Sequence, residues 1–462
     1  MTWSRVRLAS TGFEPVTRKQ LESRAITRSP SCARSGARIV GGCRDAMRSG
    51  AVLSCAMCMA LCLGAGHCQT PFEPKQGGWF GVSFDFTSMS VQQYTQQAGI
   101  YPAVWNIYVT LPMDGNSTTV LNTALPQLAA IKALVHLTVE PQSGLAAVTY
   151  PAIGKLAYYI KNAQLGGASF LINFGHEMNG DWYVWGQQPT QYVQTYQFVA
   201  RALNEMTCGV AMVWAPNAAK GYPWREANGV SPTGWGAAPG SADWAVMDTN
   251  GDGTVNQMDD ALMPYWPGDD NVSWVGMAAY SWGPGSAPFT VNSLPAAQQF
   301  TTMVDPPPVC RCKRINDYNV ANSSLYSRFS ADGVHNKPMI ITETSALYIP
   351  SNPDGNTNYQ IKSAWWQQAY NTGKDTEEAL SLAEHYPQLK MVLWFDEIKA
   401  EGSAGGNVVD WRFSADPQIR AGFTEYVINQ LTDSGAQYWG DLDAFQQSSL
   451  ASAFTCPAGP GK

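Results

Sequence analysis

Eight apolar runs rich in β-branched and aromatic residues alternate with segments of helical pattern along the chain. The runs cover residues 79–86, 103–110, 133–140, 169–177, 210–217, 272–282, 338–344 and 389–397. The helical segments cover residues 125–132, 153–163, 190–206, 360–370, 376–385 and 417–430. Strands that alternate with helices predict a parallel sheet, because parallel strands need a crossover connection. Eight such repeats predict an α/β chain folded as a (β/α)8 TIM barrel.

The runner-up fold is an open, doubly wound sheet. That fold usually carries a glycine-rich phosphate site after its first strand, and no such fingerprint follows residues 79–86. The apolar character of the runs on both faces suits strands covered by helices on one side and by a barrel interior on the other. The barrel is therefore the favoured interpretation.

Two of the connections are enlarged. Residues 218–271 follow the fifth strand and are rich in Gly, Pro and Trp, and residues 283–337 follow the sixth. Loops after the strands surround the carboxyl face of a barrel, so these two should form the walls of a cleft. The predicted catalytic barrel covers residues 71–433, and residues 434–462 are interpreted as a C-terminal tail.

The first part of the chain differs in charge from the rest. Residues 1–68 carry ten Lys/Arg against three Asp/Glu, and the remaining residues carry 19 against 33. Within 47–68, a short basic start and a roughly 13-residue apolar core predict a secretory signal peptide, too short to cross a bilayer comfortably. Residues 1–46 are then a doubtful or disordered leader. We expect a secreted, extracellular protein whose acidic body binds neither nucleic acid nor an anionic membrane.

The number and positions of the cysteines are consistent with a secreted protein. Six of the ten precede Gln69. Cys208, Cys310, Cys312 and Cys456 remain, and they predict two disulfides with three possible pairings. Sequons for N-glycosylation begin at three asparagines, Asn116, Asn271 and Asn322.

The stretch 168–186 contains an acidic residue at the end of a predicted buried strand, where burial of a charge costs free energy. The apolar run 170–174 ends in Gly175, His176 and Glu177, and an unpaired charge is expensive to bury there. Trp182, Tyr183 and Trp185 come within the next eight residues. Flat aromatic rings stack on sugar faces, and a carboxyl group can protonate a glycosidic oxygen. The stretch therefore predicts a carbohydrate site.

A second acid of the same kind is Glu343, at the end of the seventh run. If the strand count is right, Glu177 and Glu343 end strands four and seven and face one mouth of the barrel. Retaining glycosidases need two carboxyl groups about 5 to 5.5 Å apart, one as acid/base and one as nucleophile. Either glutamate alone could be a helix cap or an ion-pair partner, but their shared placement favours catalysis.

These motifs resemble glycoside hydrolase family 26, the β-mannanase family of the clan of (β/α)8 retaining glycosidases. The stretch GHEMNGDWYVWG at 175–186 looks like the acid/base signature of the family, with His176 at the place where the wider clan usually has Asn. KPMIITET at 337–344 resembles its nucleophile strand. The resemblance covers about residues 80–427 and implies that Glu177 is the acid/base and Glu343 the nucleophile.

Other segments share the resemblance: VWAPN at 213–217, YWPGDD at 265–270 and WVGMAAY at 274–280. It implies that Tyr280 hydrogen-bonds the nucleophile, that Asn217 contacts substrate, and that Trp394 is the platform under the sugar being cleaved. Each helper also has a plainer interpretation as a packing residue, as have His176 and the pair of indoles at Trp182 and Trp185. Glu140, at the end of the third run, could contact a sugar hydroxyl or form an ion pair.

The resemblance implies a retaining β-glycosidase that acts on a polysaccharide, as an endo-β-1,4-mannanase does. We expect a monomer, as is common for sugar-chain hydrolases of this size. Mixed-linkage β-glucan and β-1,3-xylan remain alternative substrates. From another class, a non-catalytic, calcium-stabilised glycan-binding barrel remains possible, although a binder has no need of a matched acid and nucleophile. A metallohydrolase using His176 is disfavoured, because the chain has five His and no HExxH pair.

A calcium-loop pattern lies in the first enlarged loop. It places acidic or amide side chains at positions 1, 3 and 5, Gly at 6 and a carboxylate at 12. Position 12 is an Asp and not the usual Glu, and the adjacent Asp260 could compete for that role. We expect one structural Ca²⁺, and no cofactor for catalysis. Its predicted ligands are Asp248, Asn250, Asp252, Thr254 and Asp259.

Overall fold

The computed structural model describes residues 70–218, 221–225, 234–285, 287–306, 324–372, 381–432, 435–452 and 454. The predicted leader (1–46) and signal peptide (47–68) lie outside these residues and stay predictions. The same holds for Cys310, Cys312, Cys456 and Asn322, whereas Cys208 is described and is disulfide-bonded. Among the helices of the described ranges, none combines the length and the apolar composition that a membrane crossing requires.

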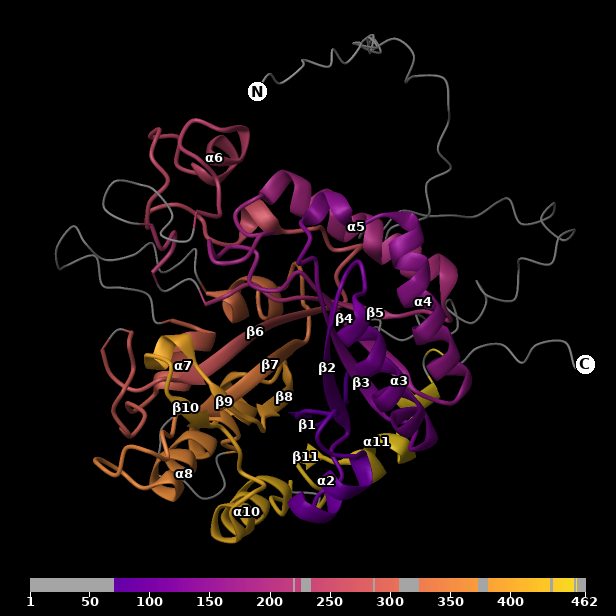
Figure 1. The fold of residues 1–462 in the computed structure, drawn as a ribbon, viewed down its shortest axis with the longest axis vertical. Helices are drawn as coiled ribbons and strands as arrows, with labels where there is room; N and C mark the ends of the chain where they lie inside the picture. The colour runs from indigo at the N-terminus through magenta and orange to yellow at the C-terminus, as the bar shows by residue number, and fades with distance from the viewer. Residues whose placement is uncertain are drawn as a thin grey trace, which may run out of the picture. The chain divides into compact units, whose positions relative to one another are not determined.

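Each of the eight predicted runs forms one strand of a closed parallel barrel (Figure 1). Every strand pairs with the next, and β1 also pairs with β8, from Trp79 opposite Met391 to Ser83 opposite Phe395. This pairing closes the sheet and confirms the predicted (β/α)8 fold. The strands are β1 Gly78–Ser83, β2 Val104–Thr110, β3 Leu134–Glu140, β4 Ser169–Phe174, β5 Ala211–Trp214, β6 Trp274–Ser281, β7 Met339–Ala346 and β8 Leu389–Phe395.

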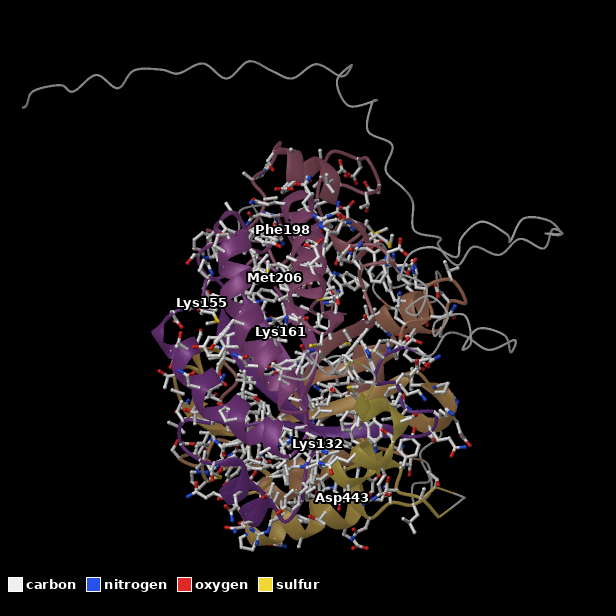
Figure 2. All side chains as sticks on the ribbon, turned by 90° about the vertical axis from the view of Figure 1, so that its right-hand side faces the viewer. Lys132, Lys155, Lys161, Phe198, Met206 and Asp443 are labelled. Atoms are coloured by element: carbon white, nitrogen blue, oxygen red, sulfur yellow. The ribbon has the colours of Figure 1, made fainter. Side chains whose placement is uncertain are left out.

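Helices follow most strands, and several begin at a side chain that accepts an amide hydrogen bond. Ser90 caps α2 in a capping box, and Thr149 caps α4. Helices α3, α4 and α5 line the outside of the strands in Figure 1, and Figure 2 labels Lys155 and Lys161 on this helical side. The helices are α2 Val91–Ala98, α3 Gly115–Ala130, α4 Tyr150–Leu165, α5 Pro189–Met206, α6 Ala242–Met247, α7 Gln299–Val304, α8 Asn358–Ala369, α9 Leu382–His385, α10 Pro417–Phe423 and α11 Leu442–Gln447.

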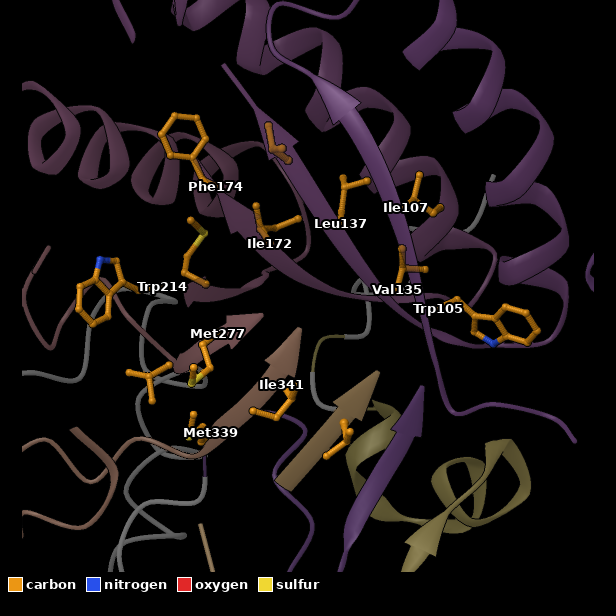
Figure 3. Packing of buried hydrophobic residues seen from close by; sticks show 14 of the residues in the cluster. Trp105, Ile107, Val135, Leu137, Ile172, Phe174, Trp214, Met277, Met339 and Ile341 are labelled. Atoms are coloured by element: carbon orange, nitrogen blue, oxygen red, sulfur yellow. The ribbon is translucent and has the colours of Figure 1, made fainter. Parts of the chain in front are cut away.

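Alternate residues of each strand enter two separate cores, because successive side chains point to opposite faces. One core lies between the strands and the helices, and Figure 3 shows part of it, including Trp105, Leu137 and Ile341. The other lies inside the barrel and includes Leu134, Leu171 and Ile340, among others. Membership of one core or the other therefore indicates which way a strand residue points.

The predicted tail is partly built into the barrel. Residues Trp439–Gly440 form β11, which pairs in parallel with the start of β1. Phe445 of α11 packs edge-on against Trp79, at 5.5 Å between ring centroids, and belongs to the interior core. The described part of this segment thus covers the end of the barrel opposite the strand ends that carry the two glutamates.

Candidate active site

Glu177 lies just beyond β4, where the chain turns sharply. Gly175 and Glu177 both have left-handed backbone, with φ of 57° and 53°. That conformation is uncommon for a residue with a side chain and tends to occur at functional sites. The Glu177 amide donates to the carbonyl of Ala215, just after β5, at 2.7 Å. The turn is therefore held by the neighbouring strand.

The carboxylate of Glu177 accepts two hydrogen bonds. The indole N–H of Trp182 donates to Oε2 at 2.9 Å, and the amide of Asn217 donates to Oε1 at 2.6 Å. The backbone of Asn217 is held by the side chain of Asn179. That side chain accepts from the backbone N–H of Asn217 at 2.8 Å and donates to the backbone carbonyl of Asn217 at 3.0 Å. Asn179 lies inside the motif at 175–186, but its role became evident only from the structure.

Glu343 faces the barrel interior because β7 contains one extra residue. Ile341 pairs with Met277 of β6, and Glu343, two residues later, pairs with the very next residue, Ala278. Ile340 points inward and Ile341 outward, so strict alternation would turn Glu343 toward the helices. A bulge at this point re-aims the side chain.

Two tyrosines donate hydrogen bonds to Glu343. Tyr280 of β6 donates to Oε2 at 2.8 Å, as the resemblance implied. Tyr108 of β2 also hydrogen-bonds this carboxylate and lowers its pKa. Tyr108 was missed from the sequence, because nothing near it marks it as different from a core tyrosine.

A buried polar layer lies on the inward faces of β1 to β3, close to Tyr108. His136 Nδ1 lies 2.8 Å from Asn106 Oδ1, which also accepts from Thr138 at 3.0 Å. The Asn106 amide donates to Ser83 at 3.4 Å, and Ser83 in turn hydrogen-bonds Tyr108. Burial lowers the pKa of His136 to about 3, so its ring is neutral. The layer therefore orients Tyr108 without adding charge.

The two glutamates form one electrostatic unit. Burial raises the pKa of both carboxyls, for Glu343 to about 7, and the hydrogen-bond donors oppose this rise. The negative charge of Glu177 further raises the pKa of Glu343. Because like charges in one site oppose each other's ionisation, the pair retains one proton over part of the pH range, and the pKa rise is larger for Glu343 than for Glu177. One acid and one carboxylate is the state that a double displacement requires.

Three further predicted residues lie near this pair. The buried Nε2 of His176 is 3.2 Å from the Tyr183 hydroxyl, and burial lowers the His176 pKa to about 4. Burial raises the pKa of Tyr183, and the charges of Glu177, Glu343 and Glu140 raise it further, so all three carboxylates lie within electrostatic reach of its hydroxyl. Glu140 accepts from Gln142 at 3.2 Å. The strand ends thus bring Glu140, Glu177 and Glu343 into one site.

Trp394 does not fit its expected role as a sugar platform. Its side chain is fully buried in the core between strands and helices, and its indole N–H donates to the carbonyl of Trp411 at 2.9 Å. The prediction is wrong by one position. Successive side chains of a strand point to opposite faces, and the side chain at position 394 points to the helices. Phe395, the next residue, points the other way and lies 6.0 Å from Tyr280 between ring centroids.

Of the two predicted indoles in the loop after β4, only Trp182 is available to substrate. Trp185 is fully buried, stacks on Tyr183 at 4.2 Å, and donates to the carbonyl of His176 at 2.9 Å. Trp185 is therefore a packing residue that supports the loop. Trp182 is half-buried and meets Trp224 edge-on at 4.9 Å, beside the Glu177 carboxylate.

The calcium-type loop is compact. Asp248 accepts from the amides of Asp252 and Gly253, at 3.1 and 2.8 Å. Both oxygens of Asp259 accept backbone amides, including that of Asn256 at 2.8 Å. Within the described ranges, no three His, Cys, Asp or Glu side chains converge as a ready metal site.

Asp260, the possible competitor in that loop, is engaged elsewhere. Its two oxygens accept from the guanidinium of Arg328, at 2.9 and 2.7 Å. Arg328 lies in a π-helical turn, Tyr326–Ser330, of the second enlarged connection. This bidentate pair joins the two enlarged connections, which leaves Asp259 as the carboxylate at position 12.

No family model matches the chain. Endoglucanase H of Acetivibrio thermocellus is 22% identical over 253 residues, which make up 54% of this chain and 19% of that protein. The chain therefore spans about a fifth of the length of the curated relative it matches.

Solved structures with similarity to this chain include GH26C from Muricauda sp. MAR_2010_75, with 14% identity, a TM-score of 0.42, and coverage of 70% of this chain and 79% of that chain. A modular endo-β-1,4-mannanase from Cellulomonas fimi has 12% identity, a TM-score of 0.42, and coverage of 84% and 76%. The GH26 domain of an endo-β-mannanase/endo-β-glucanase from Prevotella bryantii has 14% identity, a TM-score of 0.38, and coverage of 70% and 85%.

The hydroxyl of Tyr108 should hold Glu343 in its ionised form. We expect Tyr108→Phe to raise the pKa of Glu343 by up to about one unit, because a charge-assisted hydrogen bond to the carboxylate is lost. The titration is followed by NMR on protein labelled with ¹³C at glutamate carboxyls, with the Glu343 signal identified by its loss in Glu343→Gln.

Tyr196→Phe is the matched control, because the buried Tyr196 hydroxyl has no hydrogen-bond partner among the described residues. An unchanged Glu343 titration in Tyr108→Phe would contradict the assignment, as would an equal shift in the control.

Proposed function

We propose that this chain is a retaining β-glycosidase similar to glycoside hydrolase family 26 and that it hydrolyses a β-linked polysaccharide. The main support is the placement of two glutamates in one site. Glu177 and Glu343, 166 positions apart in the sequence, belong to one site, and each carboxyl is held by donors from a neighbouring strand or loop. Buried acids arranged as a matched pair have no evident structural purpose.

In the first step, a carboxylate oxygen of Glu343 attacks the anomeric carbon of the bound sugar. The bond between that carbon and the glycosidic oxygen breaks, and Glu177 gives its proton to the departing oxygen. The negative charge of Glu343 is lost as the new ester bond forms, and the hydrogen bonds from Tyr280 and Tyr108 to this carboxyl weaken. The products are a glycosyl ester on Glu343 and a free sugar chain with a new hydroxyl group.

In the second step, the Glu177 carboxylate takes a proton from water. The water oxygen attacks the anomeric carbon, and the ester bond to Glu343 breaks with its electron pair returning to the carboxylate. Two inversions at one carbon give net retention of configuration. Asn217 and Trp182 orient Glu177 throughout, since their donors fix both of its oxygens.

The two glutamates should be separable by chemical rescue. We expect Glu177→Gln and Glu343→Gln each to lower kcat by at least about a thousandfold, because neither amide can transfer the proton or form the ester. In Glu343→Ala, azide fills the vacated space and gives a glycosyl azide of inverted configuration. In Glu177→Ala, azide intercepts the ester and gives a glycosyl azide of retained configuration.

Product configuration is read by NMR, and circular dichroism checks that each variant is folded. Wild-type-like turnover in either glutamine variant would end the proposal. The opposite pairing of azide products would exchange the two roles.

The substrate proposed is β-1,4-linked mannan, cleaved within the chain. The support is the resemblance of the motifs at 175–186 and 337–344 to the β-mannanase family. We expect release of reducing ends from galactomannan at a higher rate than from barley mixed-linkage glucan or β-1,3-xylan. A higher rate on mixed-linkage glucan or on β-1,3-xylan would make that glycan the proposed substrate and leave the proposed mechanism unchanged. Tight binding without any reducing ends would favour a non-catalytic glycan-binding barrel.

The setting proposed is extracellular, with the protein acting as a monomer. The apolar stretch within 47–68, the four later cysteines and the sequons support secretion. An acidic body is consistent with a partner that is an uncharged polysaccharide and not a nucleic acid or an anionic membrane.

The loop at 248–259 is proposed to bind one structural Ca²⁺. Its carboxylate and amide side chains would supply oxygen ligands, together with the carbonyl of Thr254, and the cation would stabilise the wall after β5. The support is the spacing, and the turn in which Asp248 accepts the amides of residues 252 and 253. Binding requires Asp259 to exchange backbone donors for the cation.

Calcium should therefore stabilise the fold. At about 100 times its Kd, a ligand that binds only the folded state adds about 2.7 kcal/mol, so we expect EGTA to lower the melting temperature by several degrees. Asp252→Ala, which removes the ligand oxygens at position 5, should abolish most of this response, whereas Asp354→Ala, an exposed change in another loop, should not. Equal melting temperatures with Ca²⁺ and with EGTA would exclude the site.

A further inference from the structure

A short hairpin follows β8 at the same end of the barrel as the two glutamates. Its strands are β9 Ile398–Ala400 and β10 Val408–Asp410, and Lys399 lies in the middle of β9. About half of the Lys399 side chain is exposed. Its Nζ lies 4.8 Å from the ring centroid of Phe395 and 3.3 Å from Glu401 Oε1. Glu401 is itself fixed, because it accepts from the indole N–H of Trp411 at 2.9 Å.

Aromatic residues on either side of the hairpin pack on Tyr280, the tyrosine that donates to Glu343. The rings of Phe395 and Trp411 lie 6.0 and 5.2 Å from the ring of Tyr280. Tyr280 donates to Glu343 at 2.8 Å. The ammonium group is therefore held, through Phe395 and Glu401, against the ring cluster that contacts the proposed nucleophile.

Besides burial, one carboxyl group, two tyrosines and one lysine act on the ionisation of Glu343. The groups that shift its pKa are Tyr108 from β2, Glu177 from the loop after β4, Tyr280 from β6 and Lys399 from β9. Lys399 is the one cation among them. Its charge also lowers the pKa of Glu140 and of Glu397, which lies just beyond β8 and whose pKa burial raises to about 7. Glu397 in turn acts on both tyrosines.

We propose that Lys399 is a positioning residue whose positive charge, held against the ring cluster around Tyr280, favours the ionised form of Glu343. The inference rests on the proposed function of the two glutamates. The charge of Glu177 opposes ionisation of the nucleophile, and the carboxyl groups of Glu140 and Glu397 lie within electrostatic reach of the same lysine. One cation at the rim offsets that repulsion without touching the reacting atoms.

The sign of the effect follows from the charges. Removing a positive charge raises the pKa of Glu343, so the acidic limb of kcat/KM moves to higher pH. Removing a negative charge at the same place moves it to lower pH. Lys399 and Glu401 are paired across 3.3 Å, so Lys399→Met and Glu401→Gln change the charge at one point in opposite directions. The side-chain amide that Glu401→Gln introduces still offers an acceptor to Trp411.

The experiment compares pH profiles of kcat/KM on the best β-glycan substrate at low ionic strength. We expect Lys399→Met to move the acidic limb upward by a few tenths to about one pH unit, and Glu401→Gln to move it downward. Lys399→Arg should restore the wild-type limb. Lys161→Met, which removes a lysine from the exposed outer face of α4 (Figure 2), should leave it unchanged. In about 1 M NaCl the shifts should largely vanish, because salt screens exposed charges.

Failure of the inference differs from failure of the proposed function. An unmoved limb in Lys399→Met, or shifts of the same sign in Lys399→Met and Glu401→Gln, would overturn the role of Lys399 while hydrolysis persists. If the wild-type protein hydrolyses no β-glycan, the proposed function fails. The ¹³C titration of the Glu343 carboxyl in the same variants then tests the charge effect without activity.

Discussion

The site depends on the register shift between β6 and β7. Without the extra residue in β7, Glu343 would point into the helical layer, where an acid has no partner. Gly276 of β6 lies beside the shift, where a Cβ would come within 2.9 Å of the Ile340 side chain and 3.0 Å of the Thr342 side chain. Thr344, turned outward by the same shift, donates to the carbonyl of Ala279 at 2.7 Å. A local irregularity of the barrel thus decides which side of the sheet the acid faces.

Opposing electrostatic effects then determine the protonation state of the Glu177 and Glu343 carboxyl groups. Burial raises the pKa of both carboxyls, and donors from other strands lower it. Tyr108, Tyr280 and Asn217 come from β2, β6 and the loop after β5, so only a closed barrel assembles them. The proposed contribution of Lys399 acts in the same direction from the rim. The chemistry therefore depends on contacts between strands that are far apart along the chain.

Features set by local patterns could be predicted from the sequence. The eight strands and the place of both glutamates follow from apolar runs and from acids at their ends. Features set by non-local contacts could not. Which face of β8 the Trp394 side chain occupies cannot be told from the apolar run alone. The role of Tyr108 depends on the strand across the barrel that carries Glu343. Asn179 acts through Asn217, 38 positions away. Residues 439–447 looked like a tail because two strand residues and a short helix leave little pattern.

Mass spectrometry of the protein after treatment with an activated 2-deoxy-2-fluoro-β-glycoside identifies the nucleophile. The fluorine slows the second step more than the first, so the glycosyl ester accumulates. We expect one added glycosyl group per chain, on the peptide that contains Glu343, and none in Glu343→Gln. A label on another residue, or hydrolysis by wild-type protein with no label and with inverted product configuration, would contradict this assignment of the nucleophile.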